Sequence, residues 1–170
     1  ALAAWEVYNT TGDKNWLKNA YEIIKNSVDD DYKIIRSKET GMYSGESSFL
    51  DWREQTYPKW MSNMDIYVSQ NLGTNVVHFQ THIILSKMAK LLGEPTEKYE
   101  AIATTIKKGI NEQLWMEDKG YYAQYLYGRH HLIPSKRYEA LGEALAVIFD
   151  VANEKQSKSI IEKSPLTEFG

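Results

Sequence analysis

Apolar residues recur along this chain at the spacing of amphipathic helices, and the predicted helices come in pairs. Residues 12–30 and 93–115 each carry an apolar stripe along one helix face. The stripes consist of Trp16, Leu17, Ala20, Tyr21, Ile23, Ile24 and Val28, and of Tyr99, Ile102, Ala103, Ile106, Ile110 and Leu114. A further helical segment precedes each stripe, residues 1–9 in one case and 75–92 in the other, and each leads into a glycine-containing turn. The pattern therefore predicts helix, tight turn, helix.

A third pair is predicted from residues 138–151 and a shorter helix through Ile160 and Ile161. The helix over 75–92 is apolar around most of its circumference, so it should be buried on more than one side. We expect the same of the first helix in each pair, whereas the second helices are half polar. Apolar inner helices and amphipathic outer helices describe a two-layered toroid, and we predict an all-α fold. The pairs lie too far apart for the ~34-residue period of TPR repeats.

The connections between the pairs are long and hold most of the unusual chemistry. They include the strings GMYSG at 41–45 and KGYYAQYLYG at 119–128. The alternation of Tyr125 and Tyr127 predicts a short hairpin or an extended loop. In repeat architectures the face that carries the long insertions is usually the binding face.

Composition and charge exclude several classes of function. The net charge is −3 with no basic patch, so a nucleic-acid partner is not expected. No apolar run approaches the ~20 residues of a membrane span. The chain has no cysteine, which excludes disulfides and thiol nucleophiles and leaves its cellular compartment open. Tyrosine and tryptophan, at 12 and 5 residues, outnumber the 4 phenylalanines, and such amphipathic rings suit clefts that meet polar ligands.

The segment from Ser44 to Trp60, SGESSFLDWREQTYPKW, differs from the helical pattern around it. Between Phe49 and Trp60 it gathers two carboxylates, Asp51 and Glu54, with Arg53 and four large aromatic side chains. In a helix, Asp51 and Glu54 would share a face, and in an extended segment Asp51 and Arg53 would lie on one side. A carboxylate beside an arginine is also the composition of an ordinary structural ion pair.

Several of these features resemble the six-hairpin glycosidases, whose catalytic domain is an (α/α)6 toroid. The hairpin turns TGD and LGE, the strings LW and KGYY, and the helix EALGEALAVIFDVA are similar to those of trehalases, processing α-glucosidases and bacterial debranching-like enzymes. Trehalases carry ESGWDFSSRW, in which the aspartate protonates the leaving group. Residues 46–53, ESSFLDWR, are similar, with one additional residue before Asp51 and with Arg53 two places after it rather than four. The resemblance implies that residues 1–170 form one, incomplete toroid domain holding about three of six helical pairs.

The resemblance also implies glycoside hydrolysis, which needs two carboxyl groups around the anomeric carbon. Asp51 is the candidate general acid, and a like charge from Glu54 would favour its protonated form. An inverting mechanism on an oligosaccharide or α-glycoside is expected, with the base unrecognised in this chain or supplied by the remainder of a longer one. No cofactor and no metal are expected.

Sugar rings stack on aromatic side chains, and their hydroxyl groups need polar partners. The long connections and the first turns of the inner helices supply both kinds of residue. The expected substrate-binding residues are Trp52, Arg53, Tyr57, Trp60, Asn75, His78, Tyr122, Tyr125, Arg137, Tyr138 and Glu139, with Tyr121 and Tyr127 as further aromatics.

Two alternatives to an enzyme remain open from the sequence. The chain could be a non-catalytic carbohydrate-binding protein on the same architecture, or a helical-repeat interaction module. A metal site is not favoured: His78 and His82 stand four apart, but HFQTH lacks the glutamate of HExxH.

Overall fold

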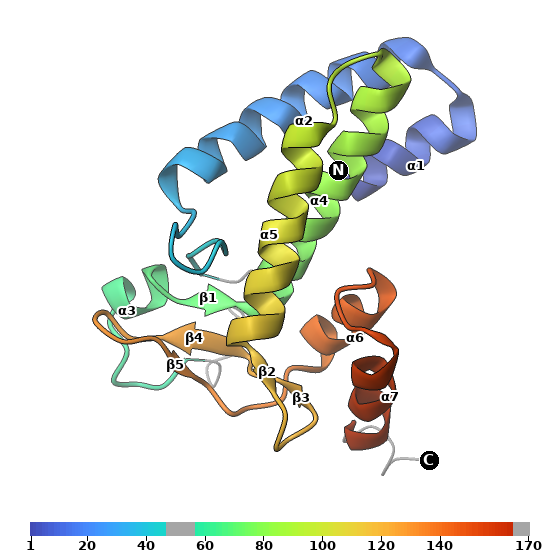
Figure 1. The fold of residues 1–170 in the computed structure, drawn as a ribbon. Coiled ribbons are helices and arrows are strands. Elements are labelled where there is room, and N and C mark those ends of the chain that lie inside the picture. The colour runs from blue at the N-terminus through green and yellow to red at the C-terminus, as the bar shows by residue number, and fades with distance from the viewer. Residues whose placement is uncertain (47–56, 165–170) are drawn as a thin grey trace.

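The computed structural model describes residues 1–46 and 57–164, and Figure 1 shows its helices packed in pairs. The paired helices are α1 Leu2–Thr11 with α2 Lys14–Ile34, α4 Leu72–Leu92 with α5 Glu97–Gln113, and α6 Ala140–Ile148 with α7 Glu154–Lys163. The short helix α3 spans Asn63–Tyr67. The predicted helical class and the pairing of the helices are therefore confirmed. No helix among the described residues is long and apolar enough to cross a membrane.

Local sequence sets the tight turns within the pairs. Gly12 ends α1 in the left-handed conformation, and Asp13 then begins α2 by accepting hydrogen bonds from the N–H groups of Asn15 and Trp16. Gly93 ends α4 in the same left-handed way. Each turn thus satisfies the backbone groups that a helix end leaves without partners.

Three details of the predicted helices are wrong. The helix expected from residue 75 begins at Leu72. The helix expected over 138–151 covers only Ala140–Ile148, because the Glu139 side chain caps its start. The first helices are not all buried: α4 has ten buried residues, whereas α1 has none. The reason is position, since α4 packs against α1, α2, α5 and α6, whereas the main packing partners of α1 among the described elements are α2 and α4.

Short strands occupy the connections around the pairs. β1 Gln70–Asn71, β4 Tyr125–Tyr127 and β5 Ile133–Pro134 form an antiparallel sheet in the order β1-β4-β5. β2 Trp115–Met116 pairs with β3 Tyr121–Tyr122. The extended segment predicted at Tyr125 and Tyr127 is β4, and its hairpin partner is β5. Gly128 turns this hairpin with a φ of 111°, and a side chain there would collide with the carbonyl of His131.

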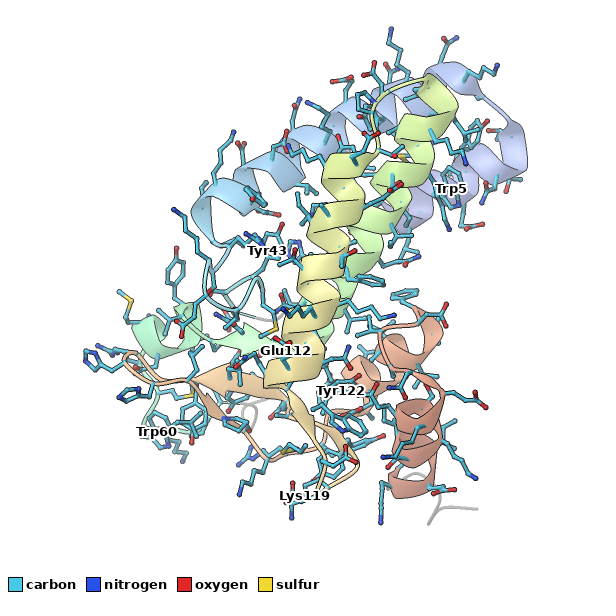
Figure 2. All side chains as sticks on the ribbon, in the orientation of Figure 1. Trp5, Tyr43, Trp60, Glu112, Lys119 and Tyr122 are labelled. Atoms are coloured by element: carbon cyan, nitrogen blue, oxygen red, sulfur yellow. The ribbon has the colours of Figure 1, made fainter. Side chains whose placement is uncertain are left out.

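The core lies along α4 and α5 and extends to the strands. One buried cluster joins these helices to β2, β3, β4 and α6, and a second joins them to α1 and α2. The connection over 35–45 crosses α5 at Gly109, where a Cβ atom would collide with the Thr40 carbonyl oxygen. Tyr43 and Tyr122, which are both fully buried, lie on this connection and at the strand end of the core (Figure 2).

Candidate functional site

Four aromatic rings gather on one face of the β1-β4-β5 sheet, and we call them the aromatic surface. Tyr125 and Tyr127 alternate along β4, so both point to that face, with ring centroids 6.1 Å apart. The ring of Tyr57 lies 5.6 Å from that of Tyr125, and the ring of Trp60 lies 5.6 Å from that of Tyr127. Trp60 is 63% exposed, whereas Tyr125 is buried. The aromatic surface therefore exposes Trp60 to solvent and is supported by the buried ring of Tyr125.

The segment that follows Trp60 is tied down by polar contacts. Ser62 and Asp65 form a capping box at the start of α3. Arg129, on the turn between β4 and β5, contacts the Asp65 carboxylate at 2.6 Å and the Ser62 hydroxyl at 3.0 Å. The Arg129 hydrogen bond holds the pKa of Asp65 well below its usual range. These contacts join the two connections that supply Trp60 and Tyr127.

Asp51, Trp52, Arg53 and Glu54 lie outside the described residues. The described residues on either side of that segment meet the sheet. The Gly45 N–H donates to the Ser69 carbonyl at 2.9 Å, and the Asn71 side chain donates to the Gly45 carbonyl at 2.8 Å. Tyr57 contacts Tyr125. The chain thus leaves and rejoins the described structure beside β1 and β4.

Burial raises the pKa of Tyr125, while a hydrogen bond with Ser135 and the positive charge of Arg137, another expected binding residue, oppose the rise. The structure brings together three of the expected binding residues, Tyr57, Trp60 and Tyr125, from connections far apart in the sequence.

Two other expected residues hold the 35–45 connection instead. The Asn75 amide accepts from the Tyr43 N–H at 2.7 Å and donates to the carbonyls of Tyr43 and Asn71, and the residue is fully buried. His78 stacks on Tyr43, with ring centroids 4.0 Å apart and ring planes 9° apart. Burial lowers the pKa of His78. Both side chains are engaged with the connection rather than with the aromatic surface.

The remaining expected residues lie near α6. Tyr122 is in the core, where its hydroxyl donates to Asn111 at 2.8 Å. Tyr138 contacts the ring of Tyr121 and lines an apolar groove of about 390 Å³ between α6 and α7. Glu139 caps α6 by accepting from the N–H groups of Leu141 and Gly142. The described contacts of these three residues do not include the aromatic surface.

The structure also contains a polar cavity of about 400 Å³. It is lined by residues of the 35–45 connection, of β1, of the end of α5 and of the turn after β4. Its polar lining includes Glu39, Gln70, Arg129 and His131. Among residues 1–46 and 57–164, no three histidine, aspartate or glutamate side chains are placed to hold a metal ion.

Sequence reasoning missed Glu143. It lies on α6 and is fully buried, and its Oε1 accepts from the Tyr122 N–H at 2.8 Å. Its Oε2 is buried and has no hydrogen-bond partner in the described structure. Burial raises the pKa of Glu143 to about 8. The available signal was a glutamate within an otherwise apolar helix, EALGEALAVIF.

These features define a class of protein: an array of helical hairpins whose long connections carry short strands and an aromatic surface. The chain belongs to a specific family within that class. Residues 1–165 match the family described as the bacterial alpha-L-rhamnosidase 6 hairpin glycosidase domain.

Individual relatives share the fold at low sequence identity. The GH78 family rhamnosidase of Bacillus sp. GL1 superposes with a TM-score of 0.73 and 19% identity, over 96% of this chain and 16% of that one. An alpha-L-rhamnosidase from Dictyoglumus thermophilum superposes with a TM-score of 0.61 and 22% sequence identity, over 94% of this chain and 16% of that one. A periplasmic trehalase of Escherichia coli O1:K1 / APEC is 23% identical over 123 residues, which is 71% of this chain and 21% of the trehalase. The chain thus spans about a fifth of the length of that relative.

Proposed function

We propose that this chain contributes the aromatic half of a glycoside hydrolase site, in which Asp51 protonates the departing glycosidic oxygen. The single observation that carries the proposal is the aromatic surface in a glycosidase-family domain. Tyr57, Trp60 and Tyr127 offer ring faces and edges for the C–H faces of a sugar, and the buried Tyr125 supports them from below.

The position of Asp51 in the chain supports its role as the acid. The residues that flank its segment, Gly45 and Tyr57, contact β1 and β4, the strands on which the aromatic surface is built. An acid that works near neutral pH must keep its proton, and apolar neighbours together with the like charge of Glu54 favour that. The expected mechanism is inverting, so a second carboxylate outside this set activates water on the opposite face of the sugar.

The three hairpins α1/α2, α4/α5 and α6/α7 are proposed to form half of an (α/α)6 ring. The six-hairpin description of the family supports this arrangement. Three further hairpins, from the remainder of a longer chain, would complete the ring and supply the base. The proposed substrates are oligosaccharides or α-glycosides, with α-L-rhamnosides and trehalose as the first candidates because relatives are named for them.

The test is hydrolysis of a panel of aryl glycosides and of trehalose by the full-length protein. Asp51→Asn should lower kcat by roughly 10²–10⁴-fold with the unfolding midpoint unchanged, the range expected when a general acid is lost. Glu112→Gln, at an exposed position on α5, is the matched control and should keep full activity. NMR of the first product anomer tests inversion.

Other outcomes favour the alternatives. Sugar binding without turnover of any glycoside would identify a non-catalytic carbohydrate-binding protein. Full activity of Asp51→Asn would remove Asp51 from the mechanism. Neither binding nor turnover would favour a helical-repeat interaction module.

A further inference from the structure

Glu143 is the buried carboxyl group that the proposed chemistry does not use. It lies one helical turn after Glu139, where the start of α6 packs against the start of α4. That packing is close because Gly142 has no side chain: a Cβ atom there would lie 3.1 Å from the Gly73 nitrogen and would collide with the Glu139 carboxylate. Glu143 is thereby fixed at the junction of the two helices, with no exposed surface.

Glu143 holds the backbone at Tyr122, three residues before Tyr125 of the aromatic surface. Its Oε1 holds the Tyr122 N–H. The next two N–H groups donate to backbone carbonyls. The Ala123 N–H donates to the Leu114 carbonyl at 2.7 Å, and the Gln124 N–H donates to the Ser135 carbonyl at 3.2 Å. The following residue is Tyr125. The three residues before the buried Tyr125 thus each have a hydrogen-bonded N–H group. The bond at Tyr122 is made by a side chain, that of Glu143.

We infer that Glu143 is a positioning residue of the carbohydrate site: by fixing the backbone at Tyr122 it sets the placement of Tyr125, whose buried ring supports those of Tyr57 and Tyr127, and thereby the affinity for sugar. This rests on the proposed function, since it assigns the binding role to the aromatic surface. Glu143 itself has no exposed atom and does not touch substrate. Its effect is exerted through Tyr125.

The surroundings of Glu143 favour its neutral form. Among the described residues, the titratable groups that act on it or feel its charge are Glu139 on its own helix, Tyr122 on β3 and Tyr138 just before α6, and none of these three is a cation. Burial and the like charge of Glu139 raise the pKa of Glu143 to about 8, while the Tyr122 hydrogen bond opposes the rise. Glutamine keeps the acceptor oxygen in this position and cannot ionise, whereas leucine fills similar space without an acceptor.

The experiment compares Glu143→Gln and Glu143→Leu with wild type in the protein as its own gene encodes it. KM and kcat are measured on the best aryl glycoside, and ¹³C-labelled tyrosine spectra report the ring of Tyr125, assigned with Tyr125→Phe. We expect Glu143→Leu to raise KM roughly tenfold with kcat within threefold, and to shift the Tyr125 ring signals. Glu143→Gln should match wild type at pH 6.

Each result bears on the inference separately from the proposed function. Unchanged Tyr125 signals in Glu143→Leu overturn the inference, whether or not a glycoside is hydrolysed. If Glu143→Leu does not fold, Glu143→Asp decides: it keeps the carboxyl group but draws the acceptor oxygen back by one methylene, and a wild-type KM with unchanged Tyr125 signals overturns the inference. If no glycoside is a substrate, the proposed function fails while the tyrosine spectra still test the placement of Tyr125.

Discussion

Replacing Glu143 by glutamine should stabilise the protein increasingly as the pH rises. The native state keeps the carboxyl proton up to a pH of about 8, whereas the ordinary pKa is 4.5. A raised native pKa means that the native state binds more protons than the unfolded state between these values. The contribution of Glu143 to stability is therefore fully present below pH 4.5 and is lost as the pH rises through 8. Glutamine has no such dependence.

The size of the effect follows from the separation of the two pKa values. Each pH unit between them costs wild type about 1.4 kcal/mol relative to a residue that does not titrate. At pH 7 the separation from 4.5 corresponds to a cost on the order of 3 kcal/mol. Because Glu143 is fully buried, solvent screening does not reduce this figure. The cost is a large part of the roughly 5–15 kcal/mol that stabilises a typical domain.

Urea denaturation followed by circular dichroism at pH 5, 6, 7 and 8 measures the effect. The difference in unfolding free energy between Glu143→Gln and wild type should grow with each step. Glu112→Gln, at an exposed position on α5, controls for the general pH dependence. Parallel curves for wild type and Glu143→Gln across this range would refute the reasoning.

Three further predictions concern packing, a buried hydrogen bond and the aromatic surface. Gly109→Ala should destabilise the protein by roughly 1–3 kcal/mol in urea denaturation, because the new methyl group meets the Thr40 carbonyl; a gain in stability, the usual effect of alanine in a helix, would contradict this. Tyr99→Phe should cost about 1 kcal/mol by losing its 3.0 Å hydroxyl contact with Tyr21; a double-mutant cycle with Tyr21→Phe that gives no coupling would remove the bond from the account. Trp60→Ala should leave the unfolding midpoint nearly unchanged and weaken sugar binding severalfold in calorimetric titration. Undiminished affinity would show that Trp60 does not bind sugar.

The helical pairs could be predicted because periodicity is a local property. The stripes within 12–30 and 93–115 encode which face of α2 and α5 is buried, and Gly12 and Gly93 encode where the preceding helices end. The burial of α1 was predicted wrongly for a related reason. An apolar composition does not say how many neighbours a helix has.

The site was predictable only in part because it forms by contacts distant in sequence. Aromatic residues on two connections suggested a common cleft, and Tyr57 does meet Tyr125. Two-residue strands such as β1 carry no periodic signal, so the sheet that joins the connections was not predicted. Glu143 was overlooked because a lone glutamate in an apolar helix is ordinarily solvated. Its burial depends on Gly142, which lets α6 approach α4.

The central claim is that sugar binds at the aromatic surface beside the segment that carries Asp51. A crystal structure of Asp51→Asn with an uncleaved glycoside tests it most directly. We expect a sugar ring in contact with Trp60, Tyr127 or Tyr57, with the glycosidic oxygen within hydrogen-bonding distance of residue 51. A glycoside bound instead in the polar cavity beside Gln70 and His131, away from these rings, would show that the aromatic surface is not the sugar-binding site.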